Sequence, residues 1–170
     1  MPCRGVYFAL TEDDVKKLMA ADGHAAVKEI IQEHIEERWD ENWLQETDKA
    51  WDAMHRCLTD GTLVCKGKTV LEKCVLGGKQ LHQGSEYIIS FLTPVEVNEV
   101  SETLKPIEQA WFREKYFGLR KRFLWFDLTE YDGPIDEDDF EYTWSYFEQT
   151  RKLFEKASRA GRAVIFTVDQ

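Results

Sequence analysis

The stretch "AVIFTV", residues 163–168, decides the fold, because it is a short apolar and β-branched run near the end of the chain. Such a run, two residues after Gly161, is typical of a buried strand. "RGVYFAL" (4–10) at the other end and "SEYIISFL" (85–92) further in are rich in the same residue types. Strands at both ends, with helical patterns between them, predict an α/β or α+β fold with a small mixed sheet that includes both terminal strands.

A long helix is expected immediately before the last strand, beginning near 135–137 and ending at Gly161. Its first turn holds four carboxylates, at 136–139, and its last turn holds Arg159. Acidic residues at the start of a helix and basic residues at its end complement the helix dipole. The apolar stripe expected on this helix consists of Trp144, Phe147, Phe154 and Ala157.

Two other helices have clear start signals. Thr11 with Asp14, and Thr93 followed by Pro94 and Glu96, fit the pattern of a capped helix N-terminus. The spacing of apolar residues predicts about five to six helices in all, with Gly118 breaking the fifth. Besides the last helix, they are expected over 11–20, 25–39, 48–58, 93–106 and 106–126.

Length, charge and cysteine spacing limit the classes of protein to consider. A chain of 170 residues fits a single domain, 1–170, and its net charge of −10 argues against nucleic-acid binding. No stretch approaches the ~18 apolar residues of a membrane span, and no secretory signal begins the sequence, so a cytoplasmic protein is expected. The four cysteines show no metal-site spacing, so we predict small core residues and neither metal nor cofactor.

Several segments together resemble the YfbM-like family, a bacterial family with a domain-of-unknown-function label. They are "RGVYFALTEDDVKKL", "TDKAWDAMHRCLTDG", "LGG", "FLTPVEVNEVSETL" and "YFEQTRKLFEKASRAGRAVIFTVD", in the family's order and over nearly the whole chain. The resemblance implies a compact α/β fold with helices packed around a small sheet. It implies no activity, cofactor or catalytic residue. By analogy only, similar small bacterial proteins act as partners in toxin–immunity gene pairs.

The clearest candidates for acid–base chemistry lie in "DKAWDAMHRCL" (48–58). Asp48 and His55 are seven residues apart, about 10.5 Å along a helix, so they cannot form a direct hydrogen bond. Asp52 lies one turn before His55 and could orient it. The simpler interpretation is a histidine at the edge of the core that is hydrogen-bonded to backbone or carboxylate. The alternative is an enzyme or small-ligand pocket around these residues.

A second candidate is the glycine pair Gly77–Gly78, which closes the β-prone run 63–78. Glycines after a strand can let backbone N–H groups approach a phosphate, but no nucleotide-binding motif is present, so a tight turn is the preferred interpretation. Hydrolase and metalloprotease motifs are also missing. The sequence therefore leaves enzymatic activity uncertain and favours a non-enzymatic protein.

The charged residues of the second half are strongly segregated. Residues 127–148 contain nine Asp or Glu and no Lys or Arg, whereas 113–126 alternates cations with aromatic residues. The acidic run lacks the glycine and the final glutamate of an EF-hand loop. The leading hypothesis is therefore a binding protein whose acidic surface, 127–148 with 36–48, engages a basic protein partner, as an immunity protein engages a toxin. The expected contact residues are Glu137, Asp138, Asp139 and Glu141, with Trp39, Trp43 or Tyr142 as aromatic anchors.

Overall fold

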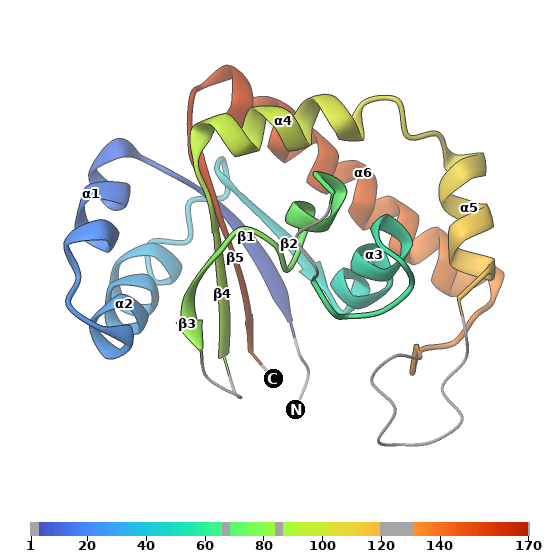
Figure 1. The fold of residues 1–170 in the computed structure, drawn as a ribbon, viewed down its shortest axis with the longest axis horizontal. Coiled ribbons are helices and arrows are strands. Elements are labelled where there is room, and N and C mark those ends of the chain that lie inside the picture. Colours follow the sequence, from blue (N-terminus) through green and yellow to red (C-terminus); the bar gives the residue numbers. More distant parts are fainter. Residues whose placement is uncertain (1–3, 66–68, 84–86, 120–130, 170) are drawn as a thin grey trace.

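The strand predicted from "AVIFTV" forms the centre of the sheet as β5 (Ala163–Asp169). It pairs on one side with β1 (Gly5–Leu10) and on the other with β4 (Tyr87–Leu92), and β2 (Leu44–Asp48) and β3 (Lys79–Gln83) form the two edges (Figure 1). Both terminal strands therefore belong to one sheet, as expected. The computed structural model describes four ranges of the chain: 4–65, 69–83, 87–119 and 131–169.

All four strand pairings of the described sheet are antiparallel, so the expectation of a mixed sheet was wrong. β1 and β5 pair from Gly5 opposite Val168 to Leu10 opposite Ala163. The other three pairings run in the same sense. The direction of a strand depends on how its connections cross the sheet and not on its own residues, so the sequence pattern could not supply it. The fold is α+β.

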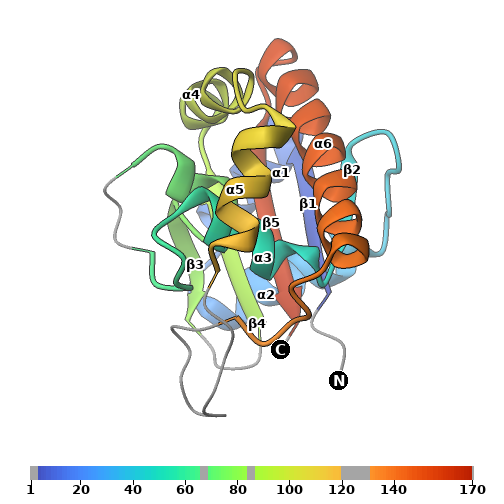
Figure 2. The same cartoon turned by 90° about the vertical axis from the view of Figure 1, so that its right-hand side faces the viewer.

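Helices cover both faces of this sheet. α1 (Glu12–Ala20) and α2 (His24–Ile30) lie on one face. The other face carries the remaining helices, as Figures 1 and 2 show from two sides. These are α3 (Ala50–Leu58), α4 (Pro94–Leu104), α5 (Gln109–Phe117) and α6 (Glu137–Arg159).

Successive side chains of the inner strands point to opposite faces of the sheet, so that each strand contributes to two hydrophobic cores. Tyr7 and Phe166 point into the larger core, under α3 to α6, and pack with ring centroids 4.7 Å apart. Phe8 and Ile165, the neighbours of Tyr7 and Phe166 in the two strands, belong to the smaller core under α1 and α2. Because β5 is buried on both faces, it shows a continuous apolar run instead of an apolar–polar alternation.

The capping signals predicted two helix starts, and the structure adds a third cap at Asp136, which was expected inside the first turn. The Thr11 and Thr93 side chains each accept a hydrogen bond from the backbone N–H three residues on, and the acid at that position binds back to the cap. Asp136 caps α6 by accepting from the N–H of Asp139 at 2.9 Å. Gly118 ends α5, as predicted. In contrast, the helix expected over 25–39 ends as a π-helical segment, Ile31–Glu36.

The run 63–78 was wrongly predicted to be extended. Its described part forms a 3₁₀ turn, Leu71–Cys74, that packs against α3 and α4. β2 and β3 were not predicted, because "LQETD" and "KQLHQ" are polar sequences with weak strand propensity. They become strands because β1 and β4 offer them unpaired edges.

Candidate functional site

The structure places His55 inside the core and not in a cleft. Its side chain is fully buried on α3, and neither ring nitrogen has a hydrogen-bond partner among the described residues. This corrects the expectation of a histidine hydrogen-bonded at the core edge. Burial, followed by the charge of Arg56, lowers the pKa of His55 to about 4. The imidazole is therefore neutral at pH 7 and has no route to a substrate proton.

The two carboxylates expected near His55 have other partners. Asp48 is the last residue of β2 instead of the first turn of a helix, with a left-handed φ of 45°. It accepts a hydrogen bond from the Tyr142 hydroxyl at 2.9 Å and lies 3.7 Å from Arg4. Asp52 pairs with the buried Arg56 at 2.5 Å. These interactions do not bring the predicted acid–base residues together at one site.

Gly77 and Gly78 are explained by close packing. A Cβ at Gly77 would lie 2.5 Å from the Glu72 carbonyl oxygen, and one at Gly78 would lie 2.5 Å from that of Phe91. Gly78 also has a left-handed φ of 84°. The pair therefore fits the turn that leads into β3, and the tight-turn interpretation accounts for both glycines.

The acidic first turn of α6 is partly engaged within the fold. Asp139 is half-buried and accepts hydrogen bonds from the hydroxyls of Tyr116 and Tyr131. Glu137 pairs with Arg113 of α5, whose guanidinium lies 4.9 Å from the Phe140 ring centroid. The cation–aromatic segment 113–126 thus begins by neutralising this turn, and its residues 120–126 lie outside the described residues. Asp138 and Glu141 are exposed.

A hollow of about 590 Å³ lies between edge strand β2 and the middle of α6. Tyr142 and Tyr146 of α6 line it with ring centroids 5.0 Å apart, and Glu41 and Glu46 line it from β2 and the chain before it. The acidic segment 36–48 and the described part of the acidic segment 127–148, from residue 131 on, therefore meet here, although about a hundred residues separate them; residues 127–130 lie outside the described residues. The other lining residues are Leu44, Gln45, Ser145 and Gln149.

The electrostatics of this hollow are negative. Burial raises the pKa of Tyr146, and the charges of Asp48 and Glu46 raise it further, against a smaller opposing effect of Arg4. Burial also raises the pKa of Tyr142, with the hydrogen bond to Asp48 next in importance. The lining residues include no lysine or arginine. We refer to this site, defined by Glu41, Glu46, Tyr142 and Tyr146, as the acidic hollow.

The two tryptophans expected as anchors lie outside the lining of the acidic hollow. Trp39 is exposed, has a left-handed φ of 41° and packs edge-on against Phe8. Trp43 is covered by Arg162, whose guanidinium carbon is 3.6 Å from the ring centroid, and by Lys156 at 4.4 Å. Trp43 therefore helps attach the chain before β2 to the end of α6.

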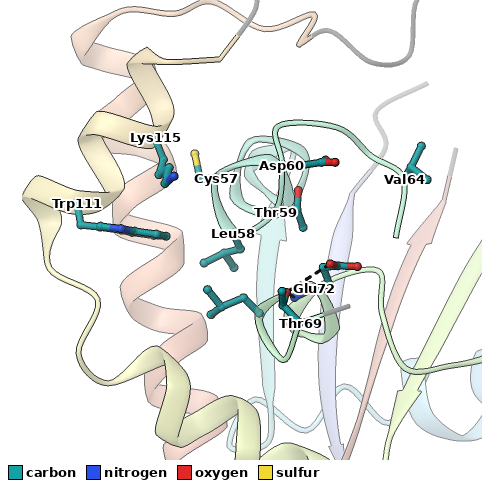
Figure 3. Close-up of a pocket in the computed structure, with 10 residues that line it drawn as sticks. Cys57, Leu58, Thr59, Asp60, Val64, Thr69, Glu72, Trp111 and Lys115 are labelled. Atoms are coloured by element: carbon teal, nitrogen blue, oxygen red, sulfur yellow. Dashed lines mark hydrogen bonds between the residues drawn. The ribbon is translucent and has the colours of Figure 1, made fainter. Parts of the chain in front are cut away.

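A second pocket, of about 420 Å³, lies between the end of α3, Val64 with residues 69–72, and α5. Trp111 and Lys115 project from α5 on one side, and Asp60 and Glu72 lie on the other (Figure 3). Cys57 contributes to the lining, but burial raises the pKa of its thiol well above the usual range, so it is not a thiolate nucleophile. We call this the α3–α5 pocket.

The family described as a domain of unknown function, DUF1877, matches residues 1–167. The chain belongs to the DUF1877 family. No curated protein matches it.

Among solved structures, this DUF1877 chain is similar to YfbM of Escherichia coli, a protein of unknown function, with a TM-score of 0.71. The two are 14% identical, and the match covers 97% of this chain and 99% of the other. The resemblance inferred from the sequence is thus confirmed at the level of family and fold. At this identity, the likeness to YfbM carries no information on activity.

Sequence reasoning missed Glu41, Glu46 and Tyr146 in the acidic hollow and the whole α3–α5 pocket of this DUF1877 chain. One signal was available, because Tyr142, Ser145, Tyr146 and Gln149 are spaced as one helix face with few apolar residues. The described residues contain no group of three or more metal-ligating side chains. In the same ranges, no helix is both long and apolar enough to cross a membrane.

Proposed function

We propose that this protein is a non-enzymatic binding protein that holds a basic segment of a protein partner in the acidic hollow. One observation carries the proposal: the fold brings the two acidic segments together around a pair of tyrosines. Glu41 and Glu46 line the hollow together with Tyr142 and Tyr146, and the lining contains no cation.

The chemistry of the hollow suits an arginine side chain of the partner. A guanidinium can stack on a tyrosine ring and bind a carboxylate through two parallel hydrogen bonds. Tyr142 and Tyr146 supply the rings, and Glu46 is an exposed carboxylate beside them. The exposed Asp138 and Glu141, further toward the start of α6, extend the negative charge along the same helix. That charge would steer a basic partner toward the hollow.

The proposal is tested by capture with charge variants of the whole chain. Wild-type protein and the Glu41→Gln/Glu46→Gln double variant are immobilised and exposed to extract of the native host at low and moderate salt. We expect a basic protein to be retained by the wild type and released by the double variant. Retention should weaken as salt increases, because the contacts are between exposed charges.

A matched control is the double variant Glu29→Gln/Glu33→Gln. It removes the same charge from exposed positions on α2 and the π-helical segment, away from the hollow. It should retain the partner as the wild type does. Equal loss from both double variants, or no basic protein retained by the wild type, would contradict the proposal.

More specifically, the partner is a toxin, and the acidic surface around the hollow covers part of the toxin's cationic substrate cleft. This form predicts a toxin gene immediately upstream in the native genome. It also predicts that the retained protein loses its toxicity when co-expressed with the wild type but not with Glu41→Gln/Glu46→Gln. A retained basic protein with no toxicity in the host would support the binding function and exclude the immunity role.

A further inference from the structure

The acidic hollow continues into a second, smaller hollow of about 190 Å³, so that one groove runs between β2 and α6. The two hollows share Leu44, Gln45 and Gln149. α6 lines the acidic hollow with residues from 142 to 149 and the second hollow with residues from 149 to 156. The groove therefore follows the helix for about four turns. The second hollow is completed by Asn42, Lys152, Leu153 and Lys156.

Three hydrogen bonds tie α6 to β2 and to the turn before it, where the helix and the strand lie side by side (Figure 2). The Tyr142 hydroxyl donates to the Asp48 carboxylate at 2.9 Å, the Gln45 amide donates to the Gln149 side chain at 3.1 Å, and the Lys156 ammonium donates to the backbone carbonyl of Asn42. From one bond to the next, the helix advances by seven residues while the other chain goes back by three. Seven helical residues span about 10.5 Å and three strand residues about 10 Å, so α6 runs antiparallel to β2 and remains in register with it.

The two hollows differ in charge. The lining of the acidic hollow includes no lysine or arginine, whereas that of the second hollow includes two lysines and no carboxylate. Lys156 is engaged by the Asn42 carbonyl. Lys152 is exposed, and no carboxylate lies within ion-pair distance of it among the residues that the structure describes. Glu148 and Glu155, about one turn before and after it, pair with arginines instead. Lys152 is therefore a cation available to a partner.

The groove borders the open edge of the sheet. Within the described sheet, β2 has a neighbouring strand on one side only. Residues 44, 45 and 46 all line the acidic hollow, and because successive side chains of a strand point to opposite faces, the hollow must border the edge of β2. The Glu46 carbonyl accepts a hydrogen bond from the side chain of the preceding Gln45 at 2.6 Å, a contact that a backbone N–H can replace. An extended peptide can add to such an edge.

From this arrangement we infer that the basic segment of the partner is an extended strand with the pattern Arg-x-x-x-Glu, which adds antiparallel to the open edge of β2. The inference rests on the proposed function and specifies the sequence that the groove recognises. The arginine enters the acidic hollow, and the glutamate pairs with Lys152 in the second hollow. The antiparallel direction continues that of the four pairings in the described sheet.

The spacing and the order of the two charges follow from the geometry of the groove. Lys152 lies eight helical residues, about 12 Å, beyond the midpoint between Tyr142 and Tyr146. Four strand residues rise about 13 Å, and side chains four apart point to the same face of a strand. Tyr142 is bonded to Asp48 at the end of β2, and Lys152 shares its hollow with Asn42, before β2. A strand antiparallel to β2 therefore presents the arginine first.

The experiment is an NMR titration of the ¹⁵N-labelled full chain with three capped peptides. They are Thr-Arg-Thr-Val-Thr-Glu-Thr, the reversed order Thr-Glu-Thr-Val-Thr-Arg-Thr, and Thr-Arg-Thr-Val-Thr-Gln-Thr. We expect the first to give saturable shifts at the amides of β2 and Lys152, and intermolecular NOEs to the backbone of β2. Its dissociation constant should be about fivefold lower than those of the other two, the upper end for an exposed ion pair. Nonspecific attraction to this chain, whose net charge is −10, would instead favour the third, more cationic peptide.

Two lysine variants test the role of the second hollow. Lys152→Gln should make the first and third peptides bind equally, because the partner of the glutamate is gone. Lys17→Gln removes the same charge from an exposed position on α1, away from the groove, and should leave the preference unchanged (Figure 1). Equal effects of the two variants, or NOEs to α6 without any to β2, would overturn the inference. Unchanged melting temperatures show that both variants are folded.

The titration separates failure of this inference from failure of the proposed function. Saturable binding of all three peptides with equal dissociation constants would overturn the pattern and still support a hollow that binds arginine. In that case Glu41→Gln/Glu46→Gln should weaken all three peptides. No saturation with any peptide would also overturn the inference, whereas the proposed function is judged by the capture of a basic protein from host extract.

Discussion

At the scale of single residues, His55 carries an energetic cost that nothing in the described fold offsets. Both ring nitrogens are buried without hydrogen bonds, and such unsatisfied groups cost about 1–3 kcal/mol. We expect His55→Leu, which is apolar and of similar size, to raise the free energy of unfolding at pH 7 by about 1 kcal/mol. Urea denaturation measures this value. His34→Leu is the control, because His34 is exposed. A loss of stability in His55→Leu would reveal a partner for the ring.

The same residue predicts how stability changes with pH. The folded-state pKa of His55 is about 4, below the ~6.5 of a histidine in the unfolded chain. As the pH falls from 6.5 to 4, the unfolded chain takes up this proton and the folded protein does not. Stability should therefore fall by ~3 kcal/mol through this window and level off below it. Urea denaturation at several pH values should show a shallower decline for His55→Leu, and parallel curves would contradict the assignment.

Gly78 is a residue whose role is steric. An alanine there would combine a left-handed φ of 84° with a Cβ 2.5 Å from the Phe91 carbonyl oxygen. We expect Gly78→Ala to lower the free energy of unfolding by about 2–3 kcal/mol. Gly23→Ala is the matched control, since Gly23 has a φ of 89° but open space around its Cβ position. Its smaller loss, near 1 kcal/mol, would isolate the cost of the contact by thermal or urea denaturation.

At the scale of the element, local signals predicted the starts of helices better than their ends. The box at Thr93 and Glu96 and the cap at Asp136 depend on residues three apart, so tertiary contacts are not needed to specify them. The end of α2 is different. Ile31 and Ile35 are both buried, but they sit in a π-helical segment that the spacing of apolar residues alone does not distinguish from an α-helix.

The Thr93 cap gives a test at this scale. Thr93→Ala removes the acceptor for the Glu96 N–H and should cost about 1 kcal/mol of unfolding free energy. Thr103→Ala, in the last turn of the same helix, should be neutral or slightly stabilising, because alanine has the higher helix propensity and the Thr103 hydroxyl only donates back to the Glu99 carbonyl of the same helix. Urea denaturation of the two variants compares them directly. Equal effects would mean that the cap is not what stabilises α4.

At the scale of the whole molecule, β5 connects the two cores. Ile165 is fully buried under α1 and α2, and Phe166 is buried on the opposite face. Ile165→Ala should therefore destabilise the protein by about 2–5 kcal/mol, although it lies near the end of the chain. Val95→Ala, at an exposed position on α4, should change stability by less than about 0.5 kcal/mol. A small effect of Ile165→Ala in calorimetry would mean that the sheet tolerates loss of its central packing.

The candidate sites were less predictable than the fold, for a physical reason. The sequence indicated the acidic segments and Tyr142, because charge density and aromatic content are visible along a chain. It misplaced His55 as a residue at the core edge, because burial of a polar ring depends on what packs around α3. It could not indicate the α3–α5 pocket, because Trp111 and Glu72 belong to separate segments that meet only after folding.

By itself, the sequence predicted a fold of mixed helices and strands, both terminal strands, two capped helix starts and the resemblance to a family. Each of these depends on residue type and short-range spacing, which the chain carries before it folds. Only the tertiary structure decided the antiparallel order of the strands, the edge strands β2 and β3, the burial of His55 and the meeting of Glu46 with Tyr146. These features depend on contacts between segments far apart in the chain, and the free energy of such contacts is not specified by the residues of any single segment.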